Sequence, residues 1–119
     1  MRRTPLLVIG LTLCVAVGGR RAAAQAPQAP DGQALYQKHC RACHGVVGAP
    51  PKNMMALYKN LRAFDSTFLA KRSEDSVVAV LKHGAGRDMK SFKDKLTPEQ
   101  MVAVAKYVRT LGSAAPKAP

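Results

Sequence analysis

Two cysteines and a histidine form the most specific motif of the chain, the run Cys40-Arg41-Ala42-Cys43-His44. Two thiols at this spacing on a helical turn can both reach the vinyl groups of one porphyrin, and the next imidazole can then bind the iron. The spacing is the pattern for covalent attachment of a c-type haem. Cys40, Cys43 and His44 are therefore predicted to hold one haem c.

Two other interpretations of the cysteine pair are weaker. A thioredoxin-like redox pair would need a preceding strand and a βαβ pattern, and the sequence shows neither. A zinc site would need further Cys or His at ligand spacing, whereas His39 and His83 are not suitably paired. A haem would also supply the apolar centre that so small a domain needs.

The opposite face of the iron needs a second axial ligand, which a methionine or histidine could supply. The candidates are His39, Met54, Met55, His83, Met89 and Met101. His39 stands next to Cys40 and cannot reach across to the other face. Met101 falls on an apolar helix stripe, where a core role is simpler. Met54 and Met55 follow the motif so closely that we expect them to pack against the haem edge.

Met89 is the predicted ligand because helix packing does not explain it. It lies in a polar, glycine-rich loop, Gly84–Phe92, between the two strongest helix patterns, and such a loop can cross the distal face of a haem. The alternatives are a packed loop residue at Met89 and ligation by His83, which ends a helix. Ligation by His and Met raises the reduction potential relative to harder ligands and fills both axial positions.

No part of the chain after the leader shows the two-residue alternation of a strand, so the predicted fold is all-α. Asp31 can cap a first helix that runs to about Cys43. A second helix starts near Ser73 and ends at Gly84, which can adopt the left-handed cap conformation. The apolar face of this second helix consists of Val77, Val80 and Leu81.

The final helix has the clearest start. Thr97 is its cap, Pro98 takes the first helical position and Gln100 completes a capping box. Gly112 is its predicted end, and its buried stripe consists of Met101, Val104, Val108 and Leu111. One or two short helices are expected within residues 53–70, with these side chains packing inward: Leu57, Leu61, Phe64 and Phe68.

Residues 1–24 have the pattern of an export signal. Arg2 and Arg3 precede an almost wholly apolar stretch, Leu6–Val17, and Ala22–Ala24 supply small residues for cleavage. The stretch is too short to span a bilayer, which needs about 20 residues; an uncleaved anchor is the alternative. We therefore expect a periplasmic protein, with a flexible leader at 25–30, a monohaem domain at 31–112 and a disordered tail at 113–119.

The chain has 119 residues and a formal net charge of +12, so one small, basic domain is expected. The basic residues in segments expected to flank the haem cleft are Arg41, Lys52, Arg87, Lys90, Lys93 and Lys95. They could steer docking on an acidic redox partner, although any single one is more simply a solvated side chain. Nucleic acid is a poor partner for an exported haem protein, and an anionic membrane surface is a weaker alternative.

Over roughly residues 31–112 the sequence resembles the class I c-type cytochromes, of the small bacterial monohaem kind. The resemblance rests on Cys40, Cys43 and His44, and on Met89 in the loop before a last helix that ends in Tyr107–Arg109. It implies the cytochrome c fold, with three main helices and short helices around one covalently attached haem. It also implies that His44 and Met89 are the axial ligands.

The resemblance further implies a close crossing of the first and last helices. Gly32 and Tyr36 precede the cysteine motif at positions that in this family pack the first helix across the last one. The glycine lets the two backbones approach, and Tyr36 is expected to stack near Tyr107.

Two expectations concern the neighbours of the ligands. Pro50 or Pro51 is expected to supply the carbonyl that orients the second nitrogen of His44. Lys90 follows Met89, where many relatives of this kind have proline, and this is a departure from the family pattern.

The predicted function is that of an electron carrier whose haem iron cycles between Fe(II) and Fe(III), with no residue needed as acid, base or nucleophile. The first alternative is a haem subunit of a larger dehydrogenase or oxidase complex, in which the same chemistry has a permanent partner. The second is a haem peroxidase or ligand sensor, which would need an open sixth site and distal acid or base groups. The sequence offers only His83 and few acids for that role.

Overall fold

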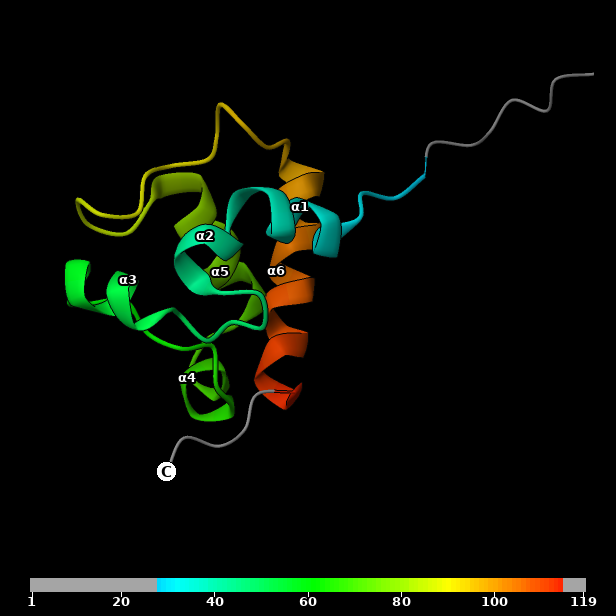
Figure 1. The fold of residues 1–119 in the computed structure, drawn as a ribbon. Coiled ribbons are helices and arrows are strands. Elements are labelled where there is room, and N and C mark those ends of the chain that lie inside the picture. Colours follow the sequence, from blue (N-terminus) through cyan, green and yellow to red (C-terminus); the bar gives the residue numbers. More distant parts are fainter. Residues whose placement is uncertain (1–27, 115–119) are drawn as a thin grey trace, which may run out of the picture.

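The computed structural model describes residues 28–114, so the predicted export signal and most of the predicted tail lie outside the described residues. The regular elements in this range are the helices α1 (Gly32–His39), α2 (Arg41–His44), α3 (Lys52–Leu57), α4 (Ser66–Ala70), α5 (Glu74–His83) and α6 (Pro98–Ala114) (Figure 1). The all-α prediction is confirmed. None of the described helices is long and apolar enough to cross a membrane.

The long helix α6 is the element against which α1, α4 and α5 pack. Figure 1 shows α1 crossing it near its upper end and α4 lying near its lower end. The predicted stripe of α6 is buried throughout, with Met101, Val104, Val108 and Leu111 each exposed by 5% or less. Burial of one such side chain contributes about 1.5–3 kcal/mol, so α6 anchors the core.

The boundaries of α6 follow the predicted start but not the predicted end. Thr97 N–H donates to Gln100 Oε1 at 2.9 Å, and Gln100 N–H donates to Thr97 Oγ1 at 3.3 Å. This reciprocal pair is the expected capping box. The helix continues past Gly112 to Ala114, because Gly112 packs against Leu69 of α4 in helical geometry instead of turning into a left-handed cap.

Helix α5 confirms its predicted boundaries. The Ser73 side chain accepts from Ser76 N–H, and Gly84 ends the helix with a positive φ of 81°. Glu74 and Asp75 occupy the first turn, where they complement the helix dipole.

The first helix is shorter than predicted, since it ends at His39 and Cys40 is its C-cap, with a φ of −119°. Its N–H still donates to Tyr36 O at 2.8 Å and closes α1. The chain then makes a separate helical turn, α2, which ends at Gly45. The cysteine motif thus begins at a bend between two helices.

The segment 53–70 contains two short helices, as expected, but α3 buries none of its residues. Leu57 is 69% exposed, so the expectation that it packs inward is wrong. Phe64 and Phe68 do pack against the core.

The crossing of α1 and α6 brings the two backbones into direct contact. A Cβ added at Gly32 would collide with the Ala103 carbonyl. One turn further along α1, the fully buried Tyr36 ring lies 5.3 Å from the Tyr107 ring at an interplanar angle of 57°. The close helix crossing and the proximity of the two rings are confirmed, and the rings are tilted instead of stacked.

Tyr36 also ties this crossing to the turn after the cysteine motif. Its hydroxyl donates to Gly45 O at 2.8 Å in a buried position. Burial raises the pKa of Tyr36, so the hydroxyl stays protonated and keeps its donor.

Gly32→Ala is expected to destabilise the folded protein by about 1–3 kcal/mol, because the new methyl group meets backbone that cannot move aside. Guanidinium unfolding of the haem-loaded protein measures this. The control is Gln33→Ala on the exposed side of α1, which should stay within about 0.5 kcal/mol. Equal stability of the two variants would contradict the close crossing.

Tyr36→Phe is expected to lower the free energy of unfolding by about 1–3 kcal/mol, because it leaves the buried Gly45 carbonyl without its donor. Tyr107→Phe is the matched control, since the Tyr107 hydroxyl makes no hydrogen bond within residues 28–114. The same unfolding measurement applies. A loss that is no larger for Tyr36→Phe than for Tyr107→Phe would argue against the hydrogen bond.

Candidate haem-binding site

A cavity of about 1080 Å³ opens between α1, α2, α5, α6 and the loops beside them. Small-molecule and cofactor sites usually have roughly 300–1,000 Å³, so this cavity suits a large cofactor. All four predicted site residues line it, the three of the cysteine motif together with the distant Met89: Cys40, Cys43, His44 and Met89. Most of the other wall is apolar, including Leu69, Val77, Leu81 and Val104.

The two thiols reach the cavity from the bend between α1 and α2. Cys40 is buried and Cys43 is half-buried, and both are free. Burial, helped by the neighbouring Cys43, raises the pKa of the Cys40 thiol to about 11. A thioredoxin-like pair needs a lowered thiol pKa, so the electrostatics of this site disfavour that alternative. Two thiols on one turn facing an apolar cavity fit the attachment of a porphyrin.

His44 presents a neutral imidazole to the cavity. Burial lowers its pKa, which favours the unprotonated form that binds metal ions. The ring stacks on Phe64, with centroids 4.7 Å apart and an interplanar angle of 19°. Flat packing on Phe64 therefore fixes the plane of the His44 ring. The unprotonated imidazole nitrogen is a suitable ligand for iron.

The second-nitrogen contact expected for His44 is not made. Its Nδ1 is buried and has no hydrogen-bond partner within the described part of the chain, so the expectation that Pro50 or Pro51 accepts from it is wrong. The loop after the motif closes on itself, with the Gly45 α-carbon packed against the Ala49 carbonyl. The contact that the His44 ring does make is its flat packing on Phe64.

Met89 is held at the cavity by the loop between α5 and α6. Its side chain is half-buried and packs against the core. Its backbone forms an isolated antiparallel bridge with Ala85, with N···O distances of 2.8 and 3.3 Å. The loop thus places a thioether in the same cavity as His44.

The other ligand candidates lie elsewhere, with one exception. Met101 is 4% exposed within the core, as expected. Neither Met54 nor Met55 lines the cavity, so the expectation that they pack at the haem edge is wrong; both belong to the unburied helix α3. His83 is exposed and also absent from the wall. His39 does line the cavity, and its ring meets the Phe92 ring nearly edge-on at 6.4 Å.

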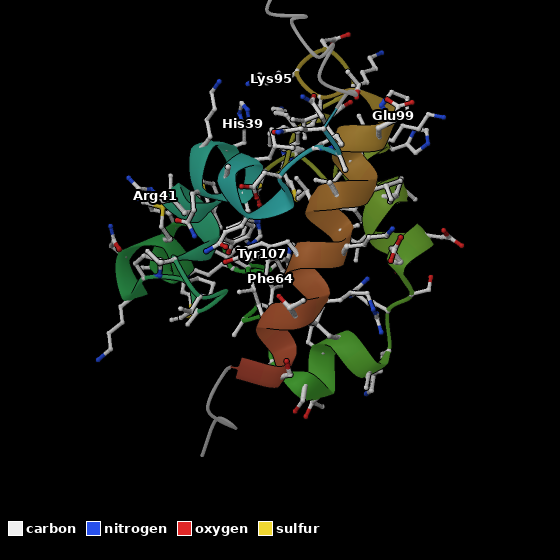
Figure 2. All side chains as sticks on the ribbon, turned by 90° about the vertical axis from the view of Figure 1, so that its right-hand side faces the viewer. His39, Arg41, Phe64, Lys95, Glu99 and Tyr107 are labelled. Atoms are coloured by element: carbon white, nitrogen blue, oxygen red, sulfur yellow. The ribbon has the colours of Figure 1, made fainter. Side chains whose placement is uncertain are left out.

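The basic residues that line the cavity differ from those expected to flank the haem cleft. All six predicted residues are exposed, but only Arg87 and Lys90 line the cavity. Figure 2 shows Arg41 and Lys95 at well-separated places on the molecule.

Arg62 and Arg72 also line the cavity, and sequence reasoning missed them. Arg72 lies over the Phe68 ring at 4.4 Å. No local pattern marks these two arginines, because the tertiary fold alone brings them to the wall. Asp88 is the one acid among the described lining residues, so the wall is positive and suits a cofactor with anionic groups.

Comparisons with known proteins agree with this geometry. The model of the family described as "Cytochrome C oxidase, cbb3-type, subunit III" matches residues 27–108. The chain is similar to cytochrome c6 of Nostoc sp., with 32% identity over 85 residues that cover 71% of this chain and 72% of that protein. It is also 29% identical over 86 residues to the cbb3-type cytochrome c oxidase subunit FixP of Azorhizobium caulinodans, covering 72% of this chain but only 28% of that protein.

Solved structures show the same likeness. The KustC0563 c-type cytochrome superposes with a TM-score of 0.62 at 38% identity, covering 68% of this chain and 96% of that one. A point mutant of the same protein gives a TM-score of 0.61 at 36% identity, covering 68% of this chain and 98% of that one. With the thiols and imidazole of one helical turn facing an apolar cavity, and a family match over most of the chain, this protein belongs to the c-type cytochromes, as a small class I member related to subunit III of cbb3-type oxidases.

Proposed function

We propose that this chain is a periplasmic electron carrier that holds one haem c through Cys40 and Cys43, with His44 and Met89 as the axial ligands. The observation that carries the proposal is the convergence of these four side chains on one apolar cavity. When bound, the haem supplies a one-electron iron couple. The proposed periplasmic location is supported by the export-signal pattern of residues 1–24.

Each residue of the site has a separate task in this proposal. The two thiols bind the cofactor, and Phe64 orients the His44 ring by stacking on it. The apolar wall excludes water, and the neutral thioether of Met89 would bind the iron on the side opposite His44. Low polarity and methionine ligation both raise the reduction potential. With His44 and Met89 both bound to the iron, no position would be left for a substrate, so the proposed role is not enzymatic.

The positive charge of the cavity wall supports the proposal of an acidic redox partner. Arg87 and Lys90 are exposed and stand at the cavity, so an acidic surface on a redox partner would be drawn toward the haem side. A permanent place in an oxidase complex is the second candidate, and the match to the subunit III family favours it. Purification from the native membrane fraction separates the two, because a subunit stays with its oxidase whereas a carrier is released.

Met89→Ala is expected to abolish the methionine–iron charge-transfer band of the ferric protein and to give a high-spin spectrum that shifts when carbon monoxide is added to the ferrous form. Visible and near-infrared spectra measure both effects. Met55→Ala on the exposed face of α3 is the control and should keep the band. A wild-type spectrum that is already high-spin would refute His44/Met89 ligation.

Lys90→Gln is expected to slow oxidation of the reduced protein by ferricyanide severalfold at low ionic strength, because a positive charge beside the cavity attracts this anion. The difference should shrink as salt screens the charge. Stopped-flow rates at several salt concentrations provide the test. Lys106→Gln removes an equal charge from α6, away from the cavity wall, and an equal effect of both variants would speak against local steering.

A further inference from the structure

The proposed distal ligand stands on a loop instead of a helix. Residues 85–88, just before Met89, are exposed. A methionine side chain is flexible and adaptable, so the place of its sulfur depends on the backbone that carries it. On the N-terminal side that backbone is fixed by the bridge to Ala85. On the C-terminal side it continues into Lys90, which lacks the ring that fixes φ in proline.

Ser91 ties this C-terminal side to the end of α5. Its hydroxyl donates to Lys82 O at 2.7 Å and accepts from Lys93 N–H at 3.2 Å. The Lys82 carbonyl is among the last four of α5, which have no partner within a helix. One hydroxyl therefore closes an open helix end and holds a loop amide at the same time.

Two backbone contacts keep the same segment against α5. Phe92 N–H donates to Leu81 O at 2.8 Å. A Cβ added at Gly84 would stand 2.5 Å from Met89 O and 3.1 Å from Ser91 N, so the loop lies directly on the end of the helix. The hydrogen bond from the Ser91 hydroxyl to Lys82 O is the side-chain contact between this loop segment and the end of α5.

We propose that Ser91 is the positioning residue for Met89. Its hydroxyl holds the ligand loop closed on α5 and so sets how readily another ligand displaces the thioether. The inference rests on the proposed ligation of the iron by Met89. A competing ligand must open the loop and break the hydrogen bond from Ser91 to Lys82, whereas the proximal side of the site stays in place.

Imidazole titration of the ferric, haem-loaded protein tests this role, with loss of the methionine–iron charge-transfer band as the readout. We expect Ser91→Ala to bind imidazole about two- to tenfold more tightly than the wild type, the range that corresponds to one neutral hydrogen bond. Ser91→Thr keeps the hydroxyl and should stay within about twofold. Ser113→Ala is the matched control, because Ser113 Oγ also donates to a backbone carbonyl, Thr110 O, at 2.7 Å.

The outcomes separate this role from the ligation itself. If the wild type shows the band and Ser91→Ala binds imidazole no more tightly than Ser113→Ala, the role of Ser91 is overturned and the ligation by Met89 stands. If the wild type shows no band and Met89→Ala changes nothing, both are overturned. If Ser91→Ala does not mature with haem, Ser91→Cys replaces it, because a thiol is a weaker donor, and the expected direction is the same.

Discussion

The direct backbone contact between α1 and α6 is the constraint on which the rest of the structure depends. Gly32 allows α1 to touch the Ala103 carbonyl, and this contact fixes where the far end of α1 lies. Cys40 follows directly, so the distance from the crossing to the proposed point of haem attachment is set by one short helix. The hydrogen bond from the Tyr36 hydroxyl to Gly45 O then links the helix crossing to the residue that follows the cysteine motif. The proximal side of the site is thus built outward from a single contact.

The distal side is built differently. Met89 does not belong to a helix. Its loop is attached to the last turn of α5 by backbone hydrogen bonds and by the hydrogen bond of the Ser91 hydroxyl. Because several weak contacts share this task, the protein holds the two proposed iron ligands, His44 and Met89, with different firmness. A helix-borne His44 and a loop-borne Met89 suit the proposed carrier, whose iron would keep both ligands through each electron transfer, and under that proposal any exchange of ligands would take place on the Met89 side.

The features that the sequence predicted well are those with local signals. Helix ends are marked by local hydrogen bonds: the side chains of Ser73, Thr97 and Gln100 accept from nearby backbone N–H groups, and the Gly84 N–H donates to Val80 O. The cysteine motif is a local pattern as well. The errors concern tertiary choices. Leu57 is as apolar as Phe64, and only the packed structure decides which of them is buried. Arg62 and Arg72 were missed for the same reason, since no spacing relates them to the motif.

Helix α3 has a consequence for the dynamics of the protein. It buries no side chain, so little free energy opposes its local opening. Tyr58, the next residue, lines the cavity and its N–H donates to Met54 O at 2.9 Å, so opening of α3 frees the backbone of one residue of the cavity wall. Amide hydrogens of α3 should exchange with solvent through local fluctuations, independently of global unfolding. The segment can also absorb insertions or substitutions without disturbing the core.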